Sequence, residues 1–420
     1  MNSLLQAGLL GLQSIITLIV SYLLLLTVAA WFAPKRTSIS PANKKLNEFL
    51  ILIPAHNEEK LLPRLLVNLR ALDYPQSHYS VHVIADNCTD KTAELARQND
   101  AIVHERWNDE QKGKGYALQW LLEKLWQKNV AHNAIVILDA DTVVSTNFLE
   151  VMNARLNNGE RVIQAYYAVE NPESSFSAGL RYAALAVLHY LRPQGRMVLG
   201  GSAGLKGNGM VFAADVMKSH PWSASVTEDI EQHMALLLSG ERVTFAPDAV
   251  IQAEMPDKLT DARSQNVRWE QGRLEMAKTY VPKLFKESTR RLRQPRKAFV
   301  LWDAIMEHLI PPFSVLAGLS IVSLLGSLVW WLVASRSLGN QASSLKAVSL
   351  SKVSLALSIS GLLGQLFYLF AGLKMVNAPR SVYRVFIYAP GYILWKIWHY
   401  LRIMFGFEQQ KWVRTTRNEG

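Results

Sequence analysis

The stretch Ala134-Ile-Val-Ile-Leu-Asp-Ala-Asp141 decides the fold class. Residues 134–138 form an uninterrupted apolar run, which is typical of a strand that helices cover on both faces, as in parallel sheets. Two carboxylates, Asp139 and Asp141, follow the run at once. Ligands of open α/β sheets bind at the carboxyl ends of the strands. The stretch therefore predicts a buried strand that delivers two acidic side chains to a binding site.

Three more apolar runs predict further buried strands. They are Phe49–Ile53, Val81–Ile84 and Val162–Ala165. Helical patterns separate them: leucines recur at helical spacing after Asn57, and Thr92–Gln98 continues the alternation. Alternating strands and helices imply an α/β domain with a mostly parallel sheet and helices on both of its faces.

The two ends of the chain are apolar enough for a membrane. Leu4–Phe32, Ile310–Val333 and Val353–Leu373 each exceed the roughly 20 residues that a membrane span needs. A cleaved signal peptide at the start is disfavoured, because its apolar run is too long and no basic residue precedes it. The final run, Val385–Phe407, contains Lys396, His399 and Arg402 within its second half. Charges are costly at the bilayer centre, so we expect an interfacial or re-entrant helix there.

Charge points to a membrane surface. The net charge is +11, and the only dense basic stretch, Lys286–Lys297, adjoins apolar segments, which favours anionic lipids over nucleic acid. Lys35 and Arg36 directly follow the first apolar run, so the positive-inside rule places the next segment in the cytoplasm. The lone Cys88 excludes internal disulfides and cysteine-rich zinc sites.

Five segments follow from these patterns. We expect an N-terminal transmembrane helix, a cytoplasmic α/β domain, amphipathic interfacial helices, C-terminal transmembrane or interfacial helices, and a basic cytoplasmic tail. Their ranges are 1–36, 47–260, 261–300, 301–407 and 408–420.

Asp139 and Asp141 suit a divalent cation. Carboxylate oxygens at i and i+2, where the chain turns, can both reach one Mg²⁺ or Mn²⁺, which usually completes its shell with substrate phosphates. A strand-end Asp-x-Asp triplet is, however, more commonly just a solvated turn. The triplet gains meaning only from its neighbours along the chain.

Three polar segments before the triplet could hold a nucleotide. In Ile53-Pro-Ala-His-Asn-Glu-Glu59, Asn57 and Glu58 could form part of a binding site for the base and ribose. The alternative is an ordinary helix start that Asn57 caps. Asp86 ends a predicted strand and could bind the base or ribose. Lys114 lies in a Gly/Lys loop that resembles a phosphate-contacting loop.

Two segments after the triplet could complete a site. In Ser225-Val-Thr-Glu-Asp229, Asp229 could act as a general base, with its pKa raised by burial or by Glu228. The capping-box spacing of Ser225 and Glu228 is the alternative explanation. In Gln265-Asn-Val-Arg-Trp269, Arg268 could clamp a diphosphate and Trp269 could offer a flat face to a sugar ring. An amphipathic interfacial helix explains the same residues.

The order of these motifs resembles that of family 2 glycosyltransferases, the inverting group with the GT-A fold that includes cellulose, hyaluronan and poly-N-acetylglucosamine synthases. The resemblance covers about Asn47–Trp269. Smaller features resemble the EpsO-like exopolysaccharide branch. These are Ala85–Asp90, Gln164–Tyr167, Leu191–Pro193 and Gly207–Met210.

The resemblance implies a role for each motif. Asp86 would contact uridine, Asp139 and Asp141 would engage the diphosphate and its metal, and Asp229 would take the proton of the acceptor hydroxyl. Asp141 would be the more direct metal ligand. Gln265 and Arg268 would hold the diphosphate side, and Trp269 would shape the acceptor pocket.

The resemblance also implies an activity. We expect a UDP-sugar donor and a single inverting displacement at the cytoplasmic face of a bacterial inner membrane. Synthases that extrude polymers enclose a pore with many helices, whereas only three spans are predicted here. We therefore expect the protein to add one or a few sugars to a lipid-linked acceptor and not to extrude a polymer alone. This transfer would serve exopolysaccharide or glycolipid assembly, with other assembly subunits as partners. The alternatives are a lipid glucosyltransferase for diacylglycerol or a hopanoid, and a non-catalytic scaffold of a synthase complex.

Overall fold

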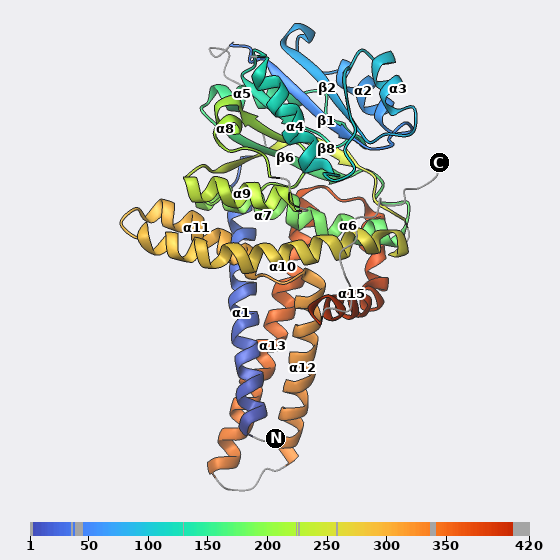
Figure 1. The fold of residues 1–420 in the computed structure, drawn as a ribbon. Coiled ribbons are helices and arrows are strands. Elements are labelled where there is room, and N and C mark those ends of the chain that lie inside the picture. The colour runs from blue at the N-terminus through green and yellow to red at the C-terminus, as the bar shows by residue number, and fades with distance from the viewer. Residues whose placement is uncertain are drawn as a thin grey trace.

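An α/β domain stands on one end of three long helices (Figure 1). The computed structural model describes residues 3–34, 37, 45–128, 130–223, 225, 227–257, 259–336 and 342–405, with the side chains of 259–266, 342–344 and 404 left out. Lys35, Arg36 and the basic tail expected at 408–420 lie outside the described residues.

The α/β domain is built on one eight-stranded sheet in the order β3-β2-β1-β4-β7-β6-β8-β5. Strands β3, β2, β1 and β4 run parallel, β6 runs parallel to β8, and β7 and β5 are antiparallel to their neighbours. The strands are β1 (Phe49–Ala55), β2 (Tyr79–Asp86), β3 (Ile102–Arg106), β4 (Ala134–Ile137), β5 (Thr142–Val144), β6 (Val162–Val169), β7 (Met210–Ala213) and β8 (Val243–Ala253). The predicted mostly parallel α/β sheet is confirmed, and the two antiparallel strands are additions to it.

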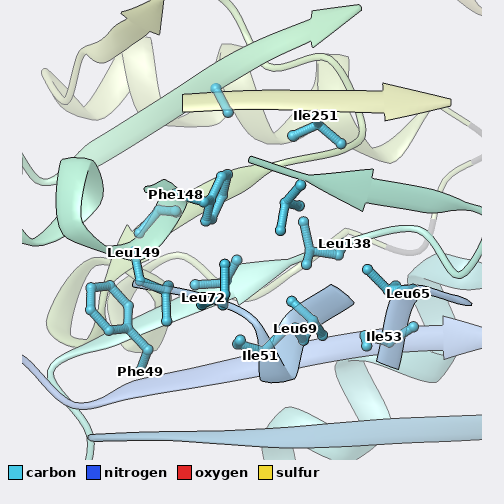
Figure 2. Packing of buried hydrophobic residues seen from close by; sticks show 14 of the residues in the cluster. Phe49, Ile51, Ile53, Leu65, Leu69, Leu72, Leu138, Phe148, Leu149 and Ile251 are labelled. Atoms are coloured by element: carbon cyan, nitrogen blue, oxygen red, sulfur yellow. The ribbon is translucent and has the colours of Figure 1, made fainter. Parts of the chain in front are cut away.

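Helices cover both faces of the sheet, and β1 shows how the sequence achieves this. Successive side chains of a strand point to opposite faces. Phe49, Ile51 and Ile53 pack in one core cluster with leucines of α2, whereas Leu50 and Leu52 pack in a second cluster with leucines of α4. Figure 2 shows the first cluster, in which Ile51 and Ile53 of β1 lie near Leu69 and Leu65. A strand buried on both faces needs a continuous apolar run, as this one has.

The shorter helices of the domain connect the strands. They are α2 (Leu62–Arg70), η1 (Gln76–His78), α3 (Thr92–Gln98), α4 (Lys114–Gln127), α5 (Phe148–Asn157), α6 (Phe176–Leu185), η2 (Ala186–Leu191), α7 (Arg192–Leu199), α8 (Ala214–Ser219) and α9 (Glu228–Ser239).

Three helices are long and apolar enough to cross a membrane: α1 (Ser3–Trp31), α12 (Phe313–Arg336) and α13 (Ala342–Met375), the last over Leu345–Met375. They stand side by side below the domain (Figure 1). The start of α1, the end of α12 and the start of α13 lie at the far end of this bundle. The three predicted apolar spans are therefore present as helices.

The remaining helices lie across the junction between the domain and the bundle (Figure 1). They are α10 (Leu259–Arg290), α11 (Pro295–Leu309), α14 (Arg380–Arg384), η3 (Val385–Tyr388) and α15 (Ala389–Met404). The run that we predicted to be interfacial forms η3 and α15. The 16-residue α15 is not among the candidate spans and lies across the bundle axis in Figure 1.

The structure excludes both of the alternative explanations by helix capping. Strand β1 continues through Pro54 to Ala55, and α2 begins only at Leu62. Asn57 therefore caps no helix: its backbone is left-handed, with φ of 56°. Helix α9 begins at Glu228 with Thr227 as its N-cap residue, so Ser225 and Glu228 do not form a capping box.

Candidate functional site

A cavity of about 1540 Å³ lies between the carboxyl edge of the sheet and the long helices. Asp139 and Asp141 line it from the segment between β4 and β5, and Glu228 and Asp229 line it from the start of α9. Its walls also include apolar side chains of α12, α13 and α15, among them Ile321, Leu325, Leu366, Phe370 and Leu394. One cavity thus joins the predicted acidic site to the helices that could span a membrane.

Lys114 organises the acidic end of the cavity. It is the first residue of α4, and Gly113 before it has a φ of 113°, a backbone conformation that favours glycine. The Lys114 ammonium lies 2.5 Å from Asp139 Oδ1 and also donates to the carbonyl of Gly207. Burial lowers the pKa of Lys114, but the charges of Asp139, Glu228 and Asp229 outweigh burial and raise it overall. Lys114 therefore stays charged beside the carboxylates.

Asp229 lies close to this arrangement. Its Oδ2 is 3.4 Å from where a Cβ on Gly207 would lie, and its Oδ1 accepts a hydrogen bond from the Ile230 amide at 2.9 Å. Burial raises the pKa of both Asp229 and Glu228, and Lys114 partly offsets the rise in each. A carboxylate whose pKa is raised toward neutrality is a better proton acceptor. The role of Asp229 as a general base stays a prediction, which its burial beside the cavity favours.

The structure positions Asp139 through its neighbours. The Asp139 amide donates to Asn208 Oδ1 at 3.1 Å, and Thr142 Oγ1 donates to the Asp139 carbonyl at 2.7 Å. Asp141 lines the cavity two residues later and is partly exposed. The two carboxylates are held at a turn between two strands rather than on a free loop.

Residues 57–59 form a structural brace with the loop after β2. Asn57 Oδ1 accepts from the Thr89 amide at 2.7 Å, and the Glu58 amide donates to Thr92 Oγ1 at 2.7 Å. Glu58 lines the cavity, whereas Asn57 is not among the described residues that line it. Of the two predicted nucleotide contacts, the structure places only Glu58 in the cavity wall.

Asp86 is set back from the cavity. It is 5% exposed, and its Oδ1 accepts a hydrogen bond from Arg106 Nη1 at 2.6 Å. Asp86 is not among the described residues that line the cavity. A contact with uridine stays a prediction for this residue, and the buried pair with Arg106 on β3 is its role in the structure.

Helix α10 brings Arg268 and Trp269 to the cavity wall. Trp269 is 40% exposed, and the guanidinium of Arg181 lies 5.8 Å from the centre of its ring. The side chain of Gln265 lies outside the described residues. Close packing fixes α10 against the site, since a Cβ on Gly272 would come within 1.9 Å of Thr227 Cγ2.

A divalent cation fits the acidic end of the cavity. The described residues hold no group of three or more His, Cys, Asp or Glu side chains arranged around a metal position. Two carboxylates together with substrate phosphates are, however, the usual surroundings of Mg²⁺. Asp139 and Asp141 supply two such carboxylates on the same cavity wall.

Sequence reasoning assigned no site role to three basic residues that line the cavity. Lys206, Arg192 and Arg196 line the cavity together with Glu307. Lys206 belongs to the glycine-rich segment 200–209, where a single lysine among five glycines could have been noticed. Arg192 lies in the Leu191–Pro193 feature, but nothing near either arginine in the sequence pointed to Glu307, which is more than 100 residues away along the chain.

The mixed sheet with its acidic cavity edge is the GT-A glycosyltransferase fold. Residues 47–272 match the family described as glycosyltransferase like family 2, and this match covers more than half of the chain. The chain belongs to this family. The EpsO-like branch within it is a finer assignment that stays a prediction.

Two relatives and one solved structure illustrate the similarity. The chain is 30% identical over 231 residues to a beta-monoglucosyldiacylglycerol synthase of Nostoc sp. (53% of this chain, 48% of the relative). It is 25% identical over 236 residues to a poly-beta-1,6-N-acetyl-D-glucosamine synthase of Staphylococcus aureus (54% of this chain, 55% of the relative). The chain thus spans about half the length of these relatives.

The solved structure is the mannosyltransferase PcManGT of Pyrobaculum calidifontis in complex with GDP-Man and Mn²⁺. It aligns with a TM-score of 0.53 at 16% identity, over 88% of this chain and 97% of that chain. The agreement concerns the fold.

Proposed function

We propose that this protein is an inverting glycosyltransferase that moves a sugar from a UDP-sugar to an acceptor held in the membrane. The observation that carries the proposal is the single cavity that joins Asp139, Asp141 and Asp229 to apolar side chains of α12 and α13. A soluble acceptor would have no use for the apolar part of this cavity. An acceptor with a hydrocarbon chain could fill both parts at once.

The reaction needs one proton acceptor. Asp229 would take the proton of the acceptor hydroxyl while its oxygen bonds to the anomeric carbon. The bond from that carbon to the diphosphate oxygen breaks on the opposite side, and UDP leaves with the electron pair. One in-line displacement inverts the anomeric centre, so no covalent intermediate on the protein is required.

The other predicted residues would bind the donor. Asp141, with Asp139, would hold Mg²⁺ or Mn²⁺, which neutralises charge on a departing diphosphate. Lys114 fixes Asp139 by its ion pair, and Arg268 would contact the diphosphate. Trp269 would offer its exposed face to a sugar ring. Asn57, Glu58, Asp86, Glu228 and Gln265 are the remaining proposed donor-site residues.

The location follows from the same features. We place the α/β domain at the cytoplasmic face of a bacterial inner membrane, with α1, α12 and α13 as spans and α10, α11 and α15 at the interface. The basic stretch Lys286–Lys297 lies at the end of α10 and the start of α11, where anionic headgroups would meet it.

Two classes of acceptor are compatible with this proposal. The name of the Nostoc relative favours a diacylglycerol acceptor, and the name of the Staphylococcus aureus relative favours a saccharide in exopolysaccharide assembly. The EpsO-like motifs favour the second class, with a lipid-linked saccharide as acceptor and other assembly subunits as partners. Analysis of the labelled product in lipid extracts separates the two.

The proposal is tested with a panel of UDP-sugars, purified protein and bacterial lipid vesicles. We expect UDP release from at least one donor, with the label recovered in the lipid fraction. Asp141→Ala should weaken UDP binding in the presence of Mg²⁺ or Mn²⁺ and leave metal-free binding unchanged. If no donor gives UDP release, the protein is the non-catalytic scaffold instead.

A further inference from the structure

A stacked pair of aromatic side chains in the cavity wall has no role in the mechanism above. His189 and Tyr167 both line the cavity. The centres of their rings lie 5.3 Å apart, and the ring planes are within 22° of parallel. His189 Nδ1 also lies 3.2 Å from the carbonyl oxygen of Tyr167 on β6. Stacking and this hydrogen bond together fix the imidazole ring against β6.

The backbone at His189 is unusual as well. His189 belongs to η2, one wide π-helical turn between α6 and α7. A π turn inside a longer helix is rare and frequently occurs at a functional site. Val187 of the same turn packs against α13, where a Cβ on Gly372 would come within 2.5 Å of Val187 Cγ1. The turn that carries His189 therefore also contacts a candidate membrane span.

The hydrogen bond with Tyr167 determines which nitrogen of His189 carries a proton. A carbonyl oxygen can only accept a hydrogen bond, so Nδ1 is the donor. Burial lowers the pKa of His189 to about 3, so the ring is uncharged at neutral pH. In an uncharged imidazole with its proton on Nδ1, Nε2 is a hydrogen-bond acceptor.

The Nε2 atom of His189 is accessible to a ligand. The side chain is half-buried and lines the cavity. Among the described residues, none donates a hydrogen bond to Nε2, and this atom is not sealed in the protein interior. An uncharged acceptor nitrogen suits a ligand that donates a hydrogen bond, as a sugar or polyol hydroxyl does, and it offers no proton to a phosphate oxygen.

One reacting hydroxyl cannot serve both Asp229 and His189. A hydroxyl carries a single proton, and Asp229 would take that proton in the proposed reaction. The hydrogen bond to His189 Nε2 therefore requires a second hydroxyl, which could belong to the donor sugar or to the acceptor.

The position of His189 in the fold favours the acceptor. The ion pair of Lys114 with Asp139, at the proposed donor site, follows strand β4. His189 is held against β6, and β7 lies between these two strands in the sheet. The turn that carries His189 contacts α13, one of the helices from which a membrane acceptor would enter the cavity.

We propose that the acceptor is a lipid whose headgroup carries a further hydroxyl beside the reacting one, as a sugar or another polyol does, and that His189 Nε2 accepts a hydrogen bond from this second hydroxyl. This inference rests on the proposed function. It favours a saccharide-bearing lipid and disfavours diacylglycerol, which has a single hydroxyl.

The test compares the binding of glucosyl dioctanoylglycerol with that of dioctanoylglycerol, which lacks only the sugar. Calorimetric titration of the purified protein in lauryldimethylamine oxide, a detergent without sugar, measures both affinities. We expect the wild type to prefer the glucosyl lipid. A hydrogen bond between uncharged groups contributes about three- to tenfold in affinity. His189→Phe, which keeps a flat ring against Tyr167, should weaken binding of the glucosyl lipid by this factor and leave binding of dioctanoylglycerol unchanged.

Two further variants control for loss of structure. His189→Gln should restore most of the affinity, because its side-chain carbonyl can accept a hydrogen bond near the position of Nε2. His132→Phe is the matched control, since His132 Nδ1 also contacts a backbone carbonyl, that of Val130 at 2.6 Å, but His132 is not among the described residues that line the cavity. Thermal unfolding and UDP binding of His189→Phe should equal those of the wild type.

Three results would overturn the inference. They are equal affinity of the wild type for the two lipids, an equal loss for both lipids in His189→Phe, and a loss in His189→Phe confined to binding of the UDP-sugar. The last result would place the second hydroxyl on the donor.

Sugar transfer separates this inference from the proposed function. If the protein glycosylates lipids and His189→Phe does not change its lipid preference, the hydroxyl site is wrong and the transferase proposal stands. If no donor sugar is transferred and the His189-dependent lipid preference is present, the hydroxyl site stands and the transferase proposal is wrong.

Discussion

Glu307→Gln tests the electrostatics that hold the domain on its membrane helices. The substitution keeps the shape of the side chain and removes its charge. Glu307 Oε2 lies 2.7 Å from Arg196 Nη2 and 3.4 Å from Arg192 Nη1, and both arginines are almost fully buried. Burial raises the pKa of Glu307, but the two arginines and Lys206 outweigh it and hold the pKa well below its usual range.

The expected loss in the free energy of unfolding follows from the fact that Arg192 and Arg196 lose the charge of their shared partner. Removing one member of a buried ion pair costs about 3–5 kcal/mol. We expect the lower end, about 3 kcal/mol, because Asp303 stays within 3.5 Å of Arg196 Nε. The Arg192 bond to Tyr368 should also weaken, so α7 should loosen from α13 first.

The free energy of unfolding is measured by titration with SDS in mixed micelles, with tryptophan fluorescence as the signal. Asp215→Asn is the control, since Asp215 forms an exposed pair with Arg161 at 3.0 Å, and exposed pairs contribute about 0–1 kcal/mol. Adding Arg196→Met to Glu307→Gln should recover part of the loss. A loss for Glu307→Gln no larger than that of the control would refute the reasoning.

Three smaller predictions follow from other contacts. Burial and His104 lower the pKa of His82 from 6.5 to about 4. The unfolded state therefore binds a proton more readily than the folded state, and the free energy of unfolding falls as the pH drops from 6.5 toward 4. His82→Phe should flatten this pH dependence, as measured by thermal unfolding. Gln13 donates to serines of α12 and α13, so Gln13→Leu should cost about 1 kcal/mol in SDS titration; no loss would contradict this. Gly272→Ala should displace Thr227, because the new Cβ would lie 1.9 Å from Thr227 Cγ2. We expect sugar transfer to slow about ten- to a hundredfold. Adding Thr227→Ser, which removes Cγ2, should restore the rate.

Sequence patterns predicted the buried strands because burial on both faces demands continuous apolar runs. Phe49–Ile53 and Ala134–Leu138 are such runs, and they give the central strands β1 and β4, the latter ending at Ile137. The strand at Thr142–Val144 is too short to give a period. Strand β8 contains Pro247 and pairs with β6 across a register shift, which breaks the alternation that a pattern needs.

Site residues could be predicted from the sequence where they belong to a motif. Residues that only tertiary contacts bring to the site could not. Asp139, Asp141 and Asp229 were found by their place in a motif series, and all line the cavity. The ion pairs of Arg192 and Arg196 were not predictable, because their partner Glu307 on α11 is brought to α7 only by the tertiary fold. The alternative of a capping Asn57 does not hold, because its side chain instead accepts a hydrogen bond from the loop after β2.

The most direct test of the account is transfer of a radiolabelled sugar from a UDP-sugar into extractable lipid, by the wild type and by Asp229→Asn. The account predicts labelled lipid with the wild type. It also predicts a loss of at least about 10²-fold for Asp229→Asn, because a general base contributes 10²–10⁴-fold, with UDP binding nearly unchanged. Transfer by Asp229→Asn at the wild-type rate would contradict the account.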